Sequence, residues 1–86
     1  MKIKCELQKK RSEFYIDIGN QFKFIANYDK AIEYDEKALA IRLKSLGENH
    51  PKVAIAYNNL GGGWSKKGDN DKAIEYYEKA LAIILK

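Results

Sequence analysis

The sequence predicts an all-α fold of two tandem helix–turn–helix repeats. Residues 28–44 recur as residues 70–86, with fourteen of the seventeen positions identical at an offset of 42 residues. Apolar residues inside this block return every three or four positions, which is the period of one helix face. Glycine, proline, asparagine and aspartate separate the periodic segments where helices are expected to begin and end. A two-helix unit that recurs in this way is typical of helical repeat proteins.

The first helix is predicted to end near Ile25. Residues 1–11 are expected to be a basic extension that continues this helix backwards with a frayed start. The apolar residues that support this extension lie at helical spacing, and they are Ile3, Leu7, Phe14 and Ile18. The first repeat is then assigned to residues 12–46 and the second to residues 47–86.

The other three helices are predicted over residues 28–46, 51–67 and 70–85. Asn27 and Asp69 occupy equivalent positions before two of them, where a side-chain oxygen can accept unpaired backbone N–H groups. Gly47 and Gly68 follow helix ends, where a left-handed residue is favoured. Pro51 suits the first turn of a helix, because the N–H that proline lacks would be unpaired there.

Composition restricts the class of protein. A chain of 86 residues allows one small domain, and it contains no apolar run near the ~20 residues that cross a bilayer. Five of the first eleven residues are basic and one is acidic, whereas the remaining residues balance to zero. A basic arm for nucleic acid or acidic lipid is one interpretation, but the repeats carry no basic stripe, so a solvated helix start is preferred. The single cysteine, Cys5, fits a reducing compartment, and a cytoplasmic location is expected.

Both repeats carry a motif that resembles the tetratricopeptide repeat. The second repeat has Tyr57-x2-Leu60-Gly61-x2-Trp64 followed by Ala73, Tyr77 and Ala80, and the first has Tyr15-x2-Ile18-Gly19-x2-Phe22 followed by Ala31, Asp35 and Ala38. The 42-residue period and the Gly47–Pro51 loop are similar to the longer subtype found in kinesin light chains. The resemblance implies a short right-handed α–α solenoid that binds proteins or peptides and has no catalytic residues, cofactor or metal.

The sequence departs from the family pattern at four places. Asp35 replaces an aromatic residue, and we expect it to weaken the joint between repeats unless a cation such as Lys52 pairs with it. Ala26 stands where Gly68 ends the equivalent helix. Ile84 stands where the first repeat has Arg42, a residue expected to keep that position soluble. Gly62 and Gly63 lie inside a helix at a cost of ~1 kcal/mol each relative to alanine, so a soft or kinked helix is expected.

The resemblance also implies a concave groove lined by the first helix of each repeat. The residues that map to it are Asp17, Asn20, Phe24, Asn58, Asn59, Gly62 and Lys66. Asparagine suits recognition of an extended peptide because its amide both donates and accepts hydrogen bonds. Some relatives grip a peptide carboxylate with lysine and asparagine, but Ile16 stands where the first lysine is required, so this mode is disfavoured.

Other sites lack the residues they need. Gly63 and Gly68 have phosphate-loop spacing, but Asp69-Asn70 follows them instead of lysine and a hydroxyl residue. His50 is the only histidine and has no partner ligand nearby in sequence, so no metal site is expected.

A second hypothesis is that the chain is a self-assembling unit. About three repeats are normally needed for stability, and this chain has two. The last helix is therefore expected to leave part of its apolar stripe uncovered and to form a homo-oligomer, most simply a dimer. The residues expected to take part are Tyr77, Ala80, Leu81 and Ile84.

Overall fold

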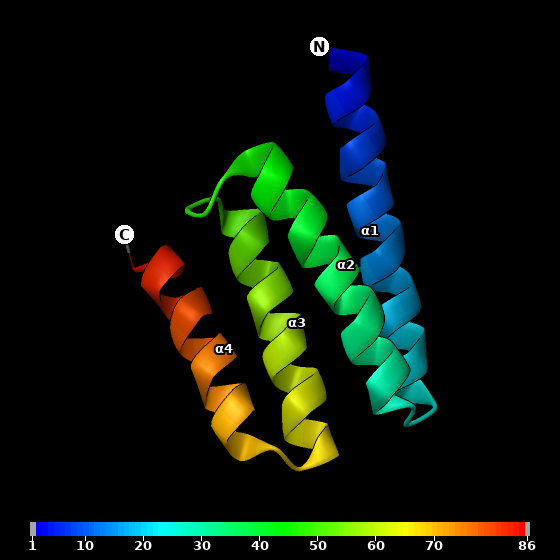
Figure 1. Cartoon of the computed structure of the whole chain (residues 1–86), viewed down its shortest axis with the longest axis vertical. Coiled ribbons are helices and arrows are strands. Elements are labelled where there is room, and N and C mark those ends of the chain that lie inside the picture. Colours follow the sequence, from blue (N-terminus) through cyan, green and yellow to red (C-terminus); the bar gives the residue numbers. More distant parts are fainter. Residues whose placement is uncertain (1, 86) are drawn as a thin grey trace.

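The computed structural model describes the backbone of residues 2–85 and the side chains of residues 7–85. The described residues form four helices, α1 (Lys2–Phe24), α2 (Tyr28–Leu46), α3 (Pro51–Lys67) and α4 (Asn70–Ile84). The helices stand in a row in chain order, and each packs antiparallel against its neighbour (Figure 1). The predicted all-α fold of two helical hairpins is confirmed. The side chains of Ile3 and Cys5, both named in the sequence predictions, lie outside the described residues.

Local signals position the helix ends. The side chain of Asn27 accepts a hydrogen bond from the backbone N–H of Lys30 at 3.3 Å, and Asp69 accepts one from that of Lys72 at 3.1 Å. Both predicted N-caps are therefore confirmed. His50 caps α3 in a way the sequence did not suggest, because its Nδ1 accepts from the backbone N–H of Lys52 at 3.1 Å. Gly68 ends α3 with a φ of 101°, in the left-handed region where glycine is favoured.

The connection between α1 and α2 carries backbone strain. Ala26 adopts a φ of 62°, and it is the non-glycine residue with a positive φ in the described chain. The left-handed region costs roughly 1–2 kcal/mol for a residue with a Cβ atom. The missing glycine noted in the sequence is thus tolerated at a cost. Helix α1 ends at Phe24, within one residue of the predicted end near Ile25.

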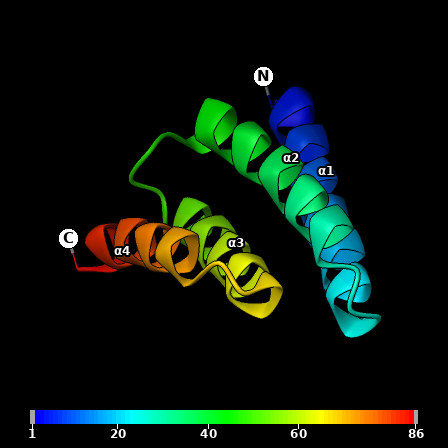
Figure 2. The same ribbon diagram turned by 60° about the horizontal axis from the view of Figure 1, so that its bottom comes forward.

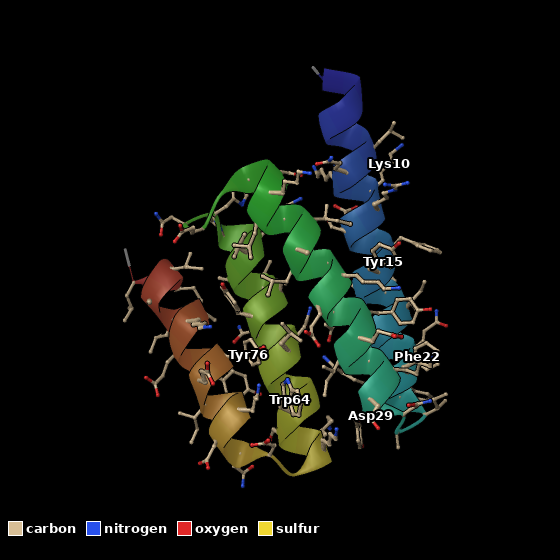
Figure 3. The ribbon with its side chains drawn as sticks, in the orientation of Figure 1. Lys10, Tyr15, Phe22, Asp29, Trp64 and Tyr76 are labelled. Atoms are coloured by element: carbon tan, nitrogen blue, oxygen red, sulfur yellow. The ribbon has the colours of Figure 1, made fainter. Side chains whose placement is uncertain are left out.

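The two hairpins pack by the same repeated contacts. Tyr34 of α2 stacks on Tyr15 and Phe22 of α1, with ring centroids 5.9 and 5.6 Å apart. In the second hairpin the equivalent Tyr76 stacks on Tyr57 at 6.1 Å. Figure 3 labels Tyr15, Phe22 and Tyr76 at these seams. The repeat therefore encodes one of these ring contacts twice, as Tyr15 with Tyr34 and as Tyr57 with Tyr76.

Close approach between helices depends on small residues. Ala31, Ala38, Ala73 and Ala80 are buried at the helix–helix seams. A Cβ atom added to Gly61 would lie 2.7 Å from the ring of Tyr77, so the ring rests directly on the backbone of α3. Between the hairpins, Val53, Ala56 and Leu60 of α3 are fully buried. This core holds the two hairpins together at an angle that is visible in Figure 2.

Helix α3 is continuous through its three glycines. Gly63 faces Ile32 of α2, and a Cβ atom there would lie 2.9 Å from Ile32 Cγ1. Gly63 therefore allows α3 to approach α2 closely. The sequence predicted only a softer helix from this glycine and did not predict this packing role.

Candidate functional site

The first helices of the two repeats, α1 and α3, carry the surface predicted to bind peptides. Asp17, Asn20 and Phe24 lie on one side of α1 because they are spaced by three and four residues. The structure leaves five of the seven predicted residues exposed and the other two half-buried; the exposed ones are Asp17, Asn20, Phe24, Asn58 and Lys66, and the half-buried ones are Asn59 and Gly62. We call this set the A-helix face. All of its members are accessible to a ligand.

Two apolar side chains stand out on this polar surface. Phe24 is 92% exposed at the end of α1. Ile55 is 50% exposed on α3, one helical turn before Asn59, and sequence reasoning missed it. The four-residue spacing to Asn59 was the signal that could have identified it. Polar groups between two exposed apolar side chains suit a ligand with a polar backbone and apolar anchors.

Lys23 connects α1 to α3 beside this face. Its Nζ donates a hydrogen bond to the backbone carbonyl of Asn59 at 2.8 Å and lies 3.2 Å from Asp35 Oδ2. A Cβ atom added to Gly62 would lie 3.8 Å from the same Nζ. The lysine side chain therefore joins α1, α2 and α3 and fixes the spacing of the A-helix face.

Asp35 is the buried partner of Lys23. Its side chain is fully buried, and Oδ1 accepts no hydrogen bond from the described residues. Burial raises the pKa of the Asp35 carboxyl, and the charge of Lys23 opposes that rise. The expected pairing with Lys52 is wrong, because the Lys52 ammonium lies 3.5 Å from Glu13 instead.

The two residues of this ion pair both differ from their equivalents in the second repeat. The second repeat has Ser65 and Tyr77 at the positions equivalent to Lys23 and Asp35. An ion pair in the first repeat thus takes the place that an aromatic ring and a small residue hold in the second. The simultaneous change of both positions between repeats was a signal for the pair in the sequence.

Arg42 is also buried, contrary to the expectation that it keeps a surface position soluble. It is 5% exposed, and its Nε donates to Ser12 Oγ at 3.2 Å while Nη1 donates to the Lys52 carbonyl at 2.9 Å. Burial lowers the pKa of the Arg42 guanidinium, and nearby Glu13 opposes this. Arg42 is a second polar joint between α1, α2 and α3, because the third helix covers the face of α2 on which it stands.

The predicted self-association residues behave differently from one another. Tyr77, Leu81 and Ile84 are 42, 52 and 61% exposed, whereas Ala80 is buried and contributes no free surface. Ile74, on the same side of α4, is 53% exposed. These residues are spaced by three and four positions, so they form one exposed apolar strip, which we call the α4 strip and define as Ile74, Tyr77, Leu81 and Ile84.

The part of the chain that the structure describes holds neither a cluster of metal-ligating side chains nor a helix able to cross a bilayer. There, no three histidine, cysteine or acidic side chains gather as a metal would require. None of the described helices combines the length and apolarity needed to cross a bilayer.

Comparison with known proteins identifies the repeat. A family model described as "Tetratricopeptide repeat" matches residues 14–86. No curated protein matches the chain.

Proposed function

The chain belongs to the tetratricopeptide repeat family, and from this we propose that it is a protein-interaction module whose A-helix face binds an extended or helical peptide. Proteins of this family generally mediate protein–protein interactions and are typically not enzymes. We further assign the chain to the subtype with a 42-residue period that resembles kinesin light chains, on the basis of its repeat length and its Gly47–Pro51 loop.

The observation that supports this function most strongly is the combination of groups on the A-helix face. Asn20 is exposed and Asn59 is half-buried, so each can offer an amide to the backbone of a peptide. Phe24 and Ile55 are exposed apolar side chains that a ligand can cover. The bonds of Lys23 to α2 and α3 fix α1 relative to α3, the two helices that carry the A-helix face. Because the face is already ordered, peptide binding costs less conformational entropy.

Replacing both Asn20 and Asn59 with alanine should weaken peptide binding about tenfold, because two hydrogen bonds to the ligand are lost. The helical content should not change, since the bond of Lys23 goes to the backbone carbonyl of Asn59 and survives the substitution. Peptides selected from a random phage-displayed library against the wild-type chain provide the ligands. Fluorescence anisotropy then gives the dissociation constants of both proteins.

The matched control is Gln21→Ala, which removes an exposed amide one position along α1 and outside the A-helix face. This variant should bind the selected peptides as tightly as the wild-type chain. If the double variant also binds all of them as tightly as wild type, the assignment of the A-helix face is wrong.

Self-association is a second candidate function, and a comparison between α4 and α2 favours it. The residues of α2 equivalent to the α4 strip are Ile32, Asp35, Leu39 and Arg42, and three of them are buried while Leu39 is half-buried. Helix α3 packs against that side of α2. Because α4 repeats most of the sequence of α2, a helix from another molecule could pack against the same side of α4. We propose that a second copy of the chain covers the α4 strip and forms a homodimer.

Light scattering at tens of micromolar should give a dimeric mass for the wild-type chain and a monomeric mass for Ile84→Arg. An arginine at Ile84, the last residue of α4, would place a charge at one end of the contact without a partner charge. The control is Ile25→Arg, since Ile25 is 65% exposed but lies after α1, away from the α4 strip. A monomeric wild-type chain, or a dimer unaffected by Ile84→Arg, would exclude this interface.

A further inference from the structure

A pocket lies between α1, α2 and the start of α3, away from the A-helix face. Its volume is about 240 Å³, and none of the seven predicted groove residues lines it. The residues that line it are Gln8, Lys9, Ser12, Ile41, Arg42, Ser45, Leu46, His50 and Lys52. The pocket thus forms where the two hairpins meet the loop that connects them, and it is a site separate from the proposed peptide face.

Among residues 7–85, whose side chains the structure describes, the ionisable groups that line this pocket are all basic or imidazole groups. They are Lys9, Arg42, His50 and Lys52. Arg42 is buried, and its Nε and Nη1 donate to Ser12 and to the Lys52 carbonyl. Among residues 7–85 no carboxylate forms an ion pair with it, because the nearby Glu13 pairs with Lys52 instead. A buried cation without a carboxylate partner is an unfavourable arrangement that an anionic ligand would relieve.

The histidine offers a second donor. His50 Nδ1 already accepts the backbone N–H of Lys52, so in the neutral ring the proton is on Nε2. Nε2–H is then the group of His50 left to donate to a ligand. Lys9 adds a charge at the edge of the pocket, where its side chain is exposed and forms no ion pair with the described residues.

The remaining wall combines two apolar side chains with the uncharged polar side chains of Gln8, Ser12 and Ser45. Ile41 and Leu46 line the pocket from α2. The side chain of Leu46, the last residue of α2, is 41% exposed. A purely ionic ligand such as phosphate would leave these side chains without contacts. A ligand with an aliphatic body and one anionic end would use both parts of the wall.

We propose that this pocket binds an aliphatic carboxylate of about the size of one branched side chain, with its carboxylate at Arg42, Lys9 and His50 and its apolar body between Ile41 and Leu46. Two sources share this chemistry. One is a free short-chain carboxylic acid, and the other is an aliphatic residue at the C-terminus of a protein. The residues involved differ from Asn20 and Asn59, so this site is independent of the peptide face.

Titration of the ¹⁵N-labelled chain with 4-methylpentanoate, followed by NMR, tests the proposal. The backbone amides of Ser12, Ser45, Leu46 and His50 should shift and saturate. The neutral analogue 4-methylpentanamide should bind about tenfold more weakly, because it lacks the charge that Arg42 and Lys9 recognise. Equal shifts with the acid and the amide, or no saturable shifts with either, would overturn the proposal.

A short peptide ending in leucine distinguishes the two sources. Tighter binding of the peptide with a free carboxylate than of 4-methylpentanoate would identify a protein C-terminus as the ligand. Tighter binding of the free acid would identify a small molecule. The same peptide with an amidated C-terminus should bind about tenfold more weakly than the free peptide, because it also lacks the charge. Equal binding of the two peptides would contradict recognition of the carboxylate.

Two neighbouring lysines provide a matched pair of variants. Lys9→Gln should weaken binding of 4-methylpentanoate about threefold, the effect of one partly exposed charge pair. Lys10→Gln should have no effect, because Lys10 does not line the pocket and points away from α2 (Figure 3). Equal effects of the two substitutions would show that general positive charge, and not the pocket, attracts the acid.

A pocket-filling variant tests the location directly. Ser45→Leu places an aliphatic side chain in the cavity and should abolish the saturable shifts at Ser12 and His50. Thermal denaturation shows whether this variant folds. If it does not fold, the comparison of Lys9→Gln with Lys10→Gln tests the location of the bound acid. Undiminished binding to a folded Ser45→Leu variant would place the acid elsewhere.

Discussion

Replacing Lys23 with alanine should lower the free energy of unfolding near neutral pH by about 2–3 kcal/mol, because the fully buried carboxylate of Asp35 loses its ion-pair partner. The estimate lies at or below the range for fully buried pairs, since the Lys23 side chain keeps 14% of its surface exposed. Chemical denaturation followed by circular dichroism measures the change. The matched control is Lys30→Ala, whose exposed pair with Glu33 should contribute at most a few tenths of a kcal/mol.

The effect should depend on pH in a defined direction. Burial raises the pKa of Asp35 in the folded chain above the ordinary value of 3.8, so protonation favours the folded state. The stability that this protonation contributes is fully present below pH 3.8 and is lost as the pH rises through the pKa of the folded chain. The difference between the wild-type chain and Lys23→Ala should therefore be largest near neutral pH and should shrink as the pH falls.

Neutralising Asp35 should rescue the lysine variant. Asn has the shape of Asp without its charge, so Lys23→Ala combined with Asp35→Asn should be more stable near neutral pH than Lys23→Ala alone. If Lys23→Ala costs no more than Lys30→Ala, or if its cost is the same at pH 3 as near neutrality, the pair does not stabilise the joint between repeats.

Adjacent glycines of α3 should respond in opposite ways to alanine. Gly63→Ala should destabilise the chain by about 1–3 kcal/mol, because the new Cβ atom would lie 2.9 Å from Ile32 Cγ1 in a well-packed seam. Gly62→Ala should stabilise it by up to about 1 kcal/mol, since a Cβ atom there meets its nearest neighbours at an ordinary 3.8 Å and alanine favours the helix.

The melting temperatures of the two variants measure this difference with the same substitution at neighbouring positions. A gain in stability for both would show that the seam between α2 and α3 has room for a methyl group. A loss for both would show that α3 needs its glycines for a reason other than close packing with Ile32.

Local sequence signals were sufficient to predict the four helices. The predicted spans of α2 and α3 agree with the structure, and those of α1 and α4 each differ by one residue at the C-terminal end. The reason is that Asn27, Asp69, Gly68 and Pro51 act on the backbone within one helical turn, so their effects do not depend on the rest of the fold.

The polar joints between repeats could not be predicted in the same way. Arg42 is buried where α1 and α3 both meet α2, and Asp35 is buried beside Gly19 and Lys23 of α1, so both depend on contacts that are distant in sequence. Their equivalents in α4, Ile84 and Tyr77, are exposed although the two helices share most of their sequence. Identical periodicity therefore leads to different burial, and only the neighbouring helix decides which residues are covered.

The A-helix face combines features that the sequence predicts with one that depends on tertiary contacts. The accessibility of its residues followed from the repeat, since equivalent positions on α1 and α3 share one side of each helix. Lys23 was missed because it has no equivalent lysine in the second repeat, where Ser65 stands. The residue that fixes the spacing of the A-helix face is thus one in which the two repeats differ.

Mapping a selected peptide on the ¹⁵N-labelled chain by NMR tests the central claim most directly. The account predicts that the largest shifts occur at Asp17, Asn20, Asn59 and Lys66, on α1 and α3, while the exposed residues Glu36 of α2 and Glu78 of α4 do not shift. Shifts confined to the α4 strip, or to residues outside α1 and α3, would contradict binding through the A-helix face.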